Sequence, residues 1–241
     1  MDNYYNNEET ARAKEIAENL AEVQERIAQA ARVSGRDPKD ITLVSVTKTK
    51  PASDINIALH CGTQIIGENR VQELLNKLPD IQLSGQDVHL IGHLQTNKVR
   101  QIIDKVQMIQ SVDSVHLASE IEKQAKKNNL VMNILVEVNI GGEEAKSGVE
   151  PDKLPELLEK IAPFSHLCVR GLMTVPPIRT NKEELRPYFS SMRKLFVDNA
   201  LEKLDNRNMQ ILSMGMSSDF EVAIEEGATM VRVGTAIFGK R

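Results

Sequence analysis

Residues 41–60 read ITLVSVTKTKPASDINIALH: a short β-type run is followed by a turn with two lysines and a proline, and then by a helical stretch. Side chains two apart lie on one face of a strand, so Val44, Val46 and Lys48 are expected to point the same way. An ammonium group then lies at the end of an apolar face. The pattern predicts a β/α unit in which Lys48 either lies at the mouth of a site or is one of two solvated lysines at a strand end.

The same β/α pattern recurs along the chain. We identify eight β-type runs, at residues 41–46, 63–68, 88–92, 106–112, 131–139, 167–175, 209–215 and 229–234. Helical stretches are expected after the first seven, at 52–60, 71–78, 96–103, 115–127, 153–161, 182–203 and 219–226. The runs are almost continuously apolar, which is typical of parallel strands covered on both faces. They predict an α/β fold, a (β/α)₈ TIM barrel, with a doubly wound open sheet as the alternative.

An extra amphipathic helix is expected before the first strand, over residues 8–34. Its apolar residues are spaced four, three and four apart from Ile16 to Ile27, with charged residues between them. No Pro/Gly/Ser-rich linker interrupts the β/α series, so residues 8–241 are predicted to form one domain. The Asn-rich residues 1–7 are expected to be disordered.

Composition excludes several classes of function. The 241 residues carry a net charge of −4 with Lys and Arg spread along the chain, which argues against nucleic acid as a partner. The longest apolar stretch, residues 130–138, is far shorter than the ~20 residues that span a bilayer. The N-terminus lacks the features of a secretory signal, and the two cysteines fit a reducing compartment, so we expect a cytoplasmic protein. No HExxH or CxxC pattern indicates a metal site.

The stretch SMGMSSDFEVAIEEG after the seventh run has the features of an anion site. Gly215 permits a sharp turn, and Ser217 or Ser218 is a natural N-cap, with Glu221 three residues after Ser218 as in a capping box. The free amides of a helix N-terminus bind anions well. By itself the stretch is equally consistent with an ordinary helix cap.

The eighth run strengthens the case for a phosphate ligand. Gly234 and Thr235 follow it and add an unhindered amide and a second hydroxyl. Loops seven and eight of a TIM barrel often bind phosphate together. Arg232 alternates with Val231 and Val233, which are expected to face the outer helices, so the guanidinium should point into the barrel. Because a guanidinium is always charged and only donates, it would hold an unprotonated acceptor.

Lys48 completes the predicted constellation. An amine is nucleophilic only when neutral, which requires burial or a nearby positive charge such as that of Lys50. Lys50 itself precedes Pro51, where the chain already leaves the strand, so Lys48 is the better candidate for covalent chemistry. An inward lysine, a phosphate cup and an inward arginine are what pyridoxal 5′-phosphate (PLP) requires as a Schiff base.

These residues lie in a series of motifs that resembles the YggS/PROSC family, the pyridoxal phosphate homeostasis proteins. The motifs cover the chain from about residue 8 to the C-terminus: SVTKTKP, IGENRVQE, HLIGHLQTNK, VNIGGEEAKSG, RGLMTV, SMGMSSDFEVAI and GATMVRVGTAIFGKR. The resemblance implies a barrel similar to the N-terminal domain of alanine racemase. It implies that Lys48 forms the Schiff base and that Arg232 faces the pyridine nitrogen. The other residues implied at the cofactor are Asn69, Ser217, Gly234 and Thr235, with Lys50, Lys146 and Met173 as candidates for secondary contacts.

The resemblance also implies binding rather than catalysis. Racemases of this fold carry a second domain with a catalytic tyrosine, whereas this chain ends seven residues after Gly234 and has three tyrosines, none placed opposite Lys48. We therefore expect a monomeric PLP carrier with no catalytic residues that buffers PLP or delivers it to apo-enzymes. The alternatives are an amino-acid racemase using the same Schiff base, and a barrel that acts on a sugar phosphate.

Overall fold

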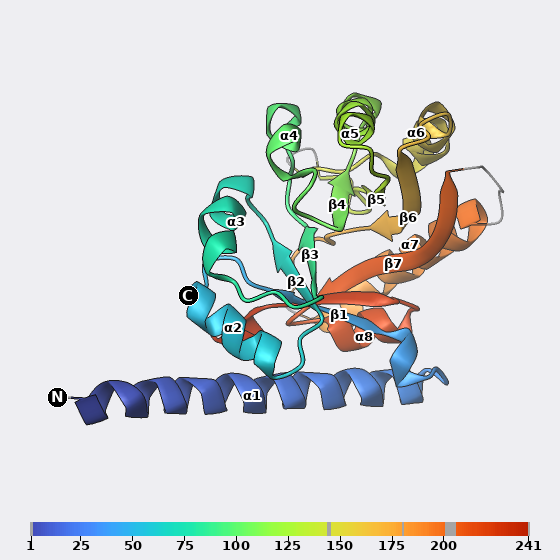
Figure 1. The fold of residues 1–241 in the computed structure, drawn as a ribbon. Coiled ribbons are helices and arrows are strands. Elements are labelled where there is room, and N and C mark those ends of the chain that lie inside the picture. The colour runs from blue at the N-terminus through green and yellow to red at the C-terminus, as the bar shows by residue number, and fades with distance from the viewer. Residues whose placement is uncertain (1, 144–145, 180, 201–205, 241) are drawn as a thin grey trace.

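The computed structural model describes residues 2–143, 146–179, 181–200 and 206–240. Eight parallel strands form a closed barrel in chain order, and strand β1 pairs with β8 (Figure 1). The strands are β1 Thr42–Val46, β2 Ile65–Glu68, β3 Asp87–Leu90, β4 Met108–Val112, β5 Met132–Glu137, β6 Leu167–Met173, β7 Arg207–Met216 and β8 Met230–Val233. The predicted TIM barrel is therefore confirmed, and the open sheet is wrong.

Helices cover the outside of the barrel. They are α1 Asp2–Val33, α2 Ala52–His60, α3 Val71–Lys77, α4 Val99–Ile102, α5 Val115–Lys127, α6 Leu154–Ile161, α7 Arg186–Ala200, α8 Phe220–Glu225 and α9 Thr235–Phe238. Short 3₁₀ turns precede α4, α6 and α7, where the expected helices begin earlier: η3 Thr96–Lys98, η4 Pro151–Lys153 and η5 Lys182–Leu185. Residues 201–203 of the helix expected at 182–203 lie outside the described residues. Two further 3₁₀ turns are η1 Pro38–Asp40 and η2 Leu78–Asp80. Sequence analysis missed α9, which is a single turn.

The extra N-terminal helix α1 lies along one side of the barrel, next to α2 and α8 (Figure 1). Its apolar stripe from Ile16 to Ile27 is buried in the main core, as the spacing predicts. The Arg26 side chain extends this contact by donating from Nε to the Glu221 carboxylate of α8 over 2.9 Å. The helix begins at Asp2 rather than at residue 8. That residues 1–7 are disordered and that residues 8–241 form a single domain remain predictions.

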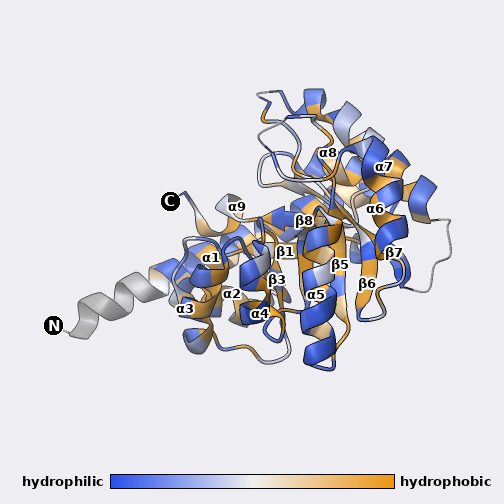
Figure 2. Ribbon diagram, turned by 90° about the horizontal axis from the view of Figure 1, so that it is seen from above, coloured by the Kyte–Doolittle hydropathy of each residue, from blue (hydrophilic) through white to orange (hydrophobic). Residues whose placement is uncertain are grey.

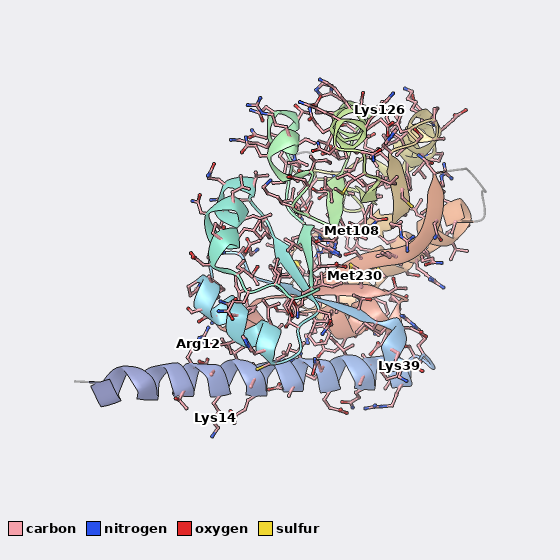
Figure 3. The ribbon with its side chains drawn as sticks, in the orientation of Figure 1. Arg12, Lys14, Lys39, Met108, Lys126 and Met230 are labelled. Carbon is pink, nitrogen blue, oxygen red and sulfur yellow. The ribbon has the colours of Figure 1, made fainter. Side chains whose placement is uncertain are left out.

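The apolar core lies in two places. A large cluster fills the layer between strands and helices, so strands such as β5 and β6 are strongly hydrophobic while the outer helices carry much polar surface (Figure 2). Smaller clusters inside the barrel include Val44 and Met230 on one side and Met108 and Leu135 on the other. Figure 3 shows Met108 and Met230 in the interior of the barrel, surrounded by the strands. A closed parallel barrel buries both faces of each strand, which explains the nearly continuous apolar runs.

Within the part of the chain that the structure describes, no helix is both long and apolar enough to cross a bilayer. Across those same residues, no cluster of three or more His, Cys, Asp or Glu side chains is arranged to hold a metal ion.

Candidate functional site

A cavity of about 620 Å³ opens where the strands end at their carboxyl termini. Most of its lining comes from the turns after β1, β7 and β8, with single residues after β2, β3 and β6. The lining residues used below are Lys48, Thr49, Lys50, Asn69, Ser217, Ser218, Arg232, Gly234 and Thr235. Six of the residues singled out in the sequence, Lys48, Asn69, Ser217, Arg232, Gly234 and Thr235, thus come together in one place.

Lys48 reaches this cavity from the turn after β1. Val44 and Val46 face the interior of the barrel, and Lys48 continues their face, as the alternation predicts. The next residue, Thr49, has a φ of +64°, which is uncommon for a β-branched residue. The Glu73 carboxylate of α3 accepts a hydrogen bond from the Thr49 amide. This contact holds the turn in its bent conformation.

A buried charge network underlies the Lys48 turn. Lys77 of α3 donates from Nζ to the Thr47 carbonyl at 2.9 Å, to Glu68 at 3.0 Å and to Glu73 at 2.5 Å. Glu68 is fully buried, and this burial raises the pKa of its carboxyl while the Thr47 hydroxyl and Lys77 oppose the rise. Sequence analysis gave no role to Glu68, although it ends the second β-type run, or to Lys77, which lies on a helix and carries no strand signal.

Arg232 points into the barrel, as predicted, and is 4% exposed. Its Nη1 donates to the Ser213 hydroxyl at 2.6 Å, and its Nη2 donates to the Thr174 carbonyl at 2.7 Å. Burial lowers the pKa of the guanidinium to about 10, against the opposing effects of Glu137 and Asp219. The group therefore stays protonated at neutral pH.

The hydrogen-bond chain continues from Arg232 across the barrel. Ser213 donates to Gln110 Oε1 at 2.8 Å, and Gln110 Nε2 lies 2.9 Å from His89 Nδ1. Burial lowers the pKa of His89 to about 4, so the imidazole is neutral and accepts from the amide. Sequence analysis missed Ser213, Gln110 and His89. The available signal was a polar residue at an inward position of an apolar strand.

The β7 and β8 turns meet through Ser217. Its Oγ accepts hydrogen bonds from the amides of Gly234 at 3.1 Å and Ala236 at 3.4 Å, which brings the predicted phosphate residues together. The expected capping box is wrong. The N-cap of α8 is Asp219, whose Oδ1 accepts from the Met216 amide, and Glu221 instead pairs with Arg26 of α1.

Asn69 lines the cavity and carries a buried acceptor. Its Oδ1 is buried without a hydrogen-bond partner among the described residues. Gly92 packs against the Asn69 backbone so closely that an added Cβ would overlap the carbonyl oxygen. Because a buried acceptor without a partner is costly, this atom marks a place where a ligand or water is needed.

The three candidates for secondary contacts are placed differently. Lys50 lines the cavity, but its ammonium donates to the carbonyls of residues 238–240. Lys146 pairs with Glu143 at 2.5 Å and donates to the Pro176 carbonyl at 3.2 Å, and it does not line the cavity. Met173 is buried inside the barrel with Met108 and Leu135. The structure therefore brings only Lys50 to the cavity.

Glu137 is a second buried acid, and its charge interacts with that of Arg232. It lies at the end of β5 and is 8% exposed. Burial raises the pKa of its carboxyl to about 7; nearby Asp113 adds to this rise and Arg232 opposes it. Sequence analysis did not single out Glu137.

Comparison with known proteins identifies the chain's relatives. The family model for the N-terminal domain of alanine racemase matches residues 13–241. The pyridoxal phosphate homeostasis protein of Aquifex aeolicus (strain VF5) is 48% identical over 224 residues, which cover 93% of this chain and 97% of the relative. The chain belongs to the pyridoxal phosphate homeostasis protein family. The family resemblance found in the motifs is thereby confirmed.

Solved structures have the same fold as this chain. PipY of Synechococcus elongatus PCC7942, with PLP bound, is 32% identical and has a TM-score of 0.80, covering 93% of this chain and 100% of PipY. Alanine racemase from Corynebacterium glutamicum has a TM-score of 0.71 at 17% identity and shows the shared fold alone. The match covers 95% of this chain but 61% of the racemase chain.

Proposed function

We propose that this protein binds PLP as a Schiff base on Lys48 and serves PLP homeostasis by buffering or delivering the cofactor. The single observation that carries the proposal is that Lys48, Arg232, Ser217 of the β7 turn and Gly234 and Thr235 of the β8 turn line one cavity of about 620 Å³. That volume lies within the range of typical small-molecule sites. The names of the relatives and the PLP bound to PipY support the same assignment.

The residues present fit each part of the cofactor. Its aldehyde reacts reversibly with an amine, and Lys48 supplies that amine. The Ser217 and Thr235 hydroxyls are suited to donate to phosphate oxygens, and the Gly234 amide, which donates to Ser217 Oγ, holds the Ser217 hydroxyl in place beside them. Arg232, a donor only, would hold the pyridine nitrogen in its unprotonated form. Asn69 would place its unsatisfied Oδ1 near the cofactor.

The absence of an evident proton-transfer partner supports binding without catalysis. Among the described residues that line the cavity, the titratable side chains are Lys48, Lys50 and Arg232. The Lys50 ammonium is engaged by backbone carbonyls, and a guanidinium does not release its proton at neutral pH. Tyr188 lies on α7, where its hydroxyl accepts from Arg179. An unprotonated pyridine nitrogen is also a weaker electron sink for amino-acid chemistry.

An absorbance spectrum tests the proposal. We expect the purified protein with added PLP to show a Schiff-base band in the visible region, and Lys48→Ala to lose it. Lys39→Ala, which removes an exposed lysine on η1, is the matched control and should retain the band. A wild-type protein that gives no band, or a Lys48→Ala variant that keeps it, would show that the assignment is wrong.

Chiral analysis after long incubation with amino acids addresses the racemase alternative, since Lys48-dependent racemisation would contradict a carrier.

We further propose that the carrier is monomeric and cytoplasmic and that PLP-dependent apo-enzymes receive its cofactor. Transfer of PLP from the loaded protein to an apo-enzyme, faster than the release of PLP into buffer, is the expected result.

A further inference from the structure

The short helix α9 follows the turn that carries the phosphate residues. It has four residues, Thr235–Phe238, and its backbone bonds are those of a single turn: the amides of Ile237 and Phe238 donate to the Gly234 carbonyl at 2.9 Å. One turn of helix is unstable by itself, and its last carbonyls have no partners within the helix. Other parts of the molecule must therefore hold α9 in place.

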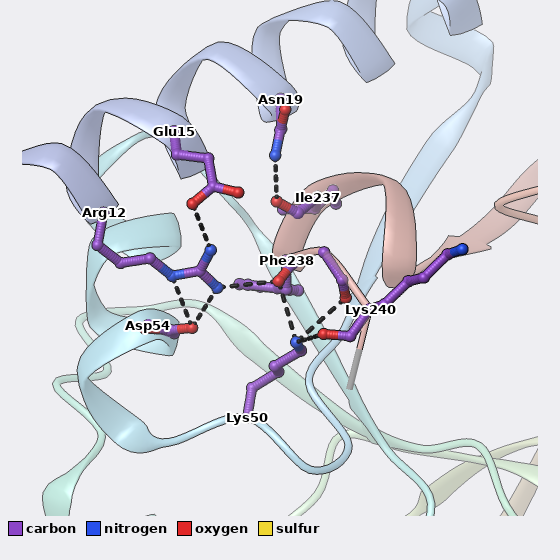
Figure 4. Close-up of polar contacts among 9 residues, drawn as sticks. Arg12, Glu15, Asn19, Lys50, Asp54, Ile237, Phe238 and Lys240 are labelled. Carbon is purple, nitrogen blue, oxygen red and sulfur yellow. Dashed lines mark hydrogen bonds and ion pairs between the residues drawn. The ribbon is translucent and has the colours of Figure 1, made fainter.

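Side chains from two distant segments supply the missing donors. Asn19 of α1 donates from Nδ2 to the Ile237 carbonyl at 3.0 Å, and Arg12 of α1 donates from Nη2 to the Phe238 carbonyl at 2.9 Å. Lys50 donates from Nζ to the carbonyls of residues 238, 239 and 240 at 3.0, 3.1 and 3.2 Å. Figure 4 shows these side chains converging on the end of α9 from opposite sides. We call Arg12, Asn19 and Lys50 the α9 clasp.

The donors of the clasp are themselves held in position. Arg12 binds the Asp54 carboxylate through Nε at 3.1 Å and through Nη2 at 2.5 Å, and it binds Glu15 at 2.8 Å (Figure 4). Asp54 belongs to α2 and is 8% exposed. Ion pairs that are partly buried and bonded through several atoms keep a defined geometry. The clasp is thus a built contact that joins α1, α2 and the end of α9.

Lys50 also joins α9 to the turn that carries Lys48. The two lysines are separated by Thr49, whose φ of +64° bends the chain, and the Lys50 amide donates to the Thr47 carbonyl at 3.1 Å. Both lysines of this turn line the cavity, and the Lys50 ammonium donates all three of its hydrogen bonds to the end of α9. The contact ties the amine side of the cavity to its phosphate side.

We propose that Lys50 and Asn19, together with Arg12, are positioning residues that fix the α9 turn and thereby set how tightly the protein holds the phosphate group of its cofactor. The inference rests on the proposed PLP function. A ligand site that is held in its binding conformation loses less entropy on binding and therefore binds more tightly. Weakening the clasp should loosen the contacts of Ser217 and Thr235 with phosphate and leave the reaction of Lys48 with an aldehyde intact.

Comparison of PLP with pyridoxal, which has the aldehyde but no phosphate, isolates this effect. Both dissociation constants are measured by absorbance titration for the wild type, Lys50→Met and Asn19→Ala. For Lys50→Met we expect about tenfold weaker binding of PLP and no more than about twofold change for pyridoxal, from the typical strength of charge-assisted hydrogen bonds. Asn19→Ala should shift PLP binding in the same direction by about threefold, because its hydrogen bond is neutral. Inorganic phosphate should compete less well with PLP in both variants.

The matched control is Lys14→Met. Lys14 lies on α1 two residues from Arg12 but projects away from the barrel, and its side chain is 75% exposed (Figure 3). This variant should bind PLP and pyridoxal as the wild type does. Thermal unfolding of each variant verifies that it is folded, and Asn19→Ala keeps the test available if Lys50→Met does not fold.

Two outcomes would overturn the clasp alone while the wild type still binds PLP. Equal weakening of PLP and pyridoxal by Lys50→Met would show that Lys50 acts on the Lys48 amine or on the whole fold. Unchanged PLP binding in both Lys50→Met and Asn19→Ala would show that α9 needs no clasp. A wild-type protein that binds neither aldehyde would refute the proposed function and the clasp together.

Discussion

The guanidinium of Arg232 is bonded to the hydroxyl of Ser213 over 2.6 Å inside the barrel, and both side chains are at least 96% buried. The Ser213 hydroxyl in turn donates a hydrogen bond to Gln110 Oε1 over 2.8 Å, and the Gln110 amide nitrogen contacts His89. A buried guanidinium is expensive unless its donors are satisfied. The series of hydrogen bonds from Arg232 through Ser213 and Gln110 to His89 therefore stabilises the guanidinium charge and fixes the direction in which Arg232 points.

Ser213→Ala tests that relationship. The substitution removes the acceptor for Arg232 Nη1 and the donor for Gln110 Oε1, and leaves both atoms in a buried site. We expect the free energy of unfolding to fall by about 1–3 kcal/mol, measured by urea denaturation, together with weaker PLP binding. Ser53→Ala, an exposed serine on α2, is the control and should change neither quantity. Wild-type stability in Ser213→Ala would contradict the role given to the hydrogen bonds of Ser213.

Lys77→Met tests the network beneath the Lys48 turn. The variant leaves the fully buried Glu68 carboxylate without its cationic partner. Breaking such a pair from one side typically costs about 3–5 kcal/mol, and we expect a loss of that size in urea denaturation. The double variant Lys77→Met/Glu68→Gln, which removes the charge as well, should recover much of the loss. If the double variant is as unstable as the sum of the single changes, the ion pair is not the cause.

His89 and Glu137 should affect the pH dependence of stability in opposite directions. The folded-state pKa of His89 is lowered to about 4, so the unfolded chain binds more protons between pH 6.5 and 4 and stability falls as pH falls. The pKa of Glu137 is raised to about 7, so the folded chain binds more protons between pH 4.5 and 7 and stability rises as pH falls. The two effects overlap and nearly cancel.

Single variants should separate these two effects. Between pH 7 and pH 5, Glu137→Gln should lose about 2 kcal/mol of unfolding free energy relative to the wild type, because only the His89 effect remains. His89→Asn should gain about 2 kcal/mol over the same interval, because only the Glu137 effect remains. Urea denaturation at both pH values measures the differences. Parallel pH profiles for all three proteins would show that neither group titrates as described.

Gly92→Ala should disturb the cavity through Asn69. The added Cβ would overlap the Asn69 carbonyl oxygen and lie 2.8 Å from its Cα, so backbone must move. Overpacking of this kind costs about 1–3 kcal/mol. Because Asn69 lines the cavity, we also expect weaker PLP binding by absorbance titration. An alanine variant with unchanged stability and affinity would mean that the β2 and β3 turns separate freely.

The fold was predictable because its signal is local and repeated. The apolar runs correspond to the eight observed strands, and two helices, Ala52–His60 and Val115–Lys127, have the predicted bounds. The helices expected at 96–103, 153–161 and 182–203 begin instead as 3₁₀ turns or start later. Helix ends are determined by capping and packing contacts that periodicity does not record.

The cavity was predictable where its residues follow strand ends. Lys48, Ser217, Gly234 and Thr235 follow strand ends that barrel geometry places at the mouth, and alternation within β8 points Arg232 inward. Met173 also ends a strand, but the structure buries it inside the barrel, and Lys146, which the family resemblance implied, pairs with Glu143 instead. The position of a residue after a strand does not specify where its side chain points when neighbouring loops compete for it.

By itself, the sequence determined that the chain forms a β/α barrel and which strand ends carry an amine, a guanidinium and the serine, glycine and threonine expected at a phosphate. It could do so because strand and helix periodicity and the repeated β/α order are local properties. Only the tertiary structure decided that Lys50 binds the end of α9, that Lys77 pairs with Glu68 under the Lys48 turn, and that Ser213 links Arg232 to Gln110. Lys50 bonds carbonyls 188–190 residues away along the chain and Ser213 bonds Gln110 103 residues away, so barrel closure brings these groups together. Lys77 meets Glu68 because α3 packs against the end of β2.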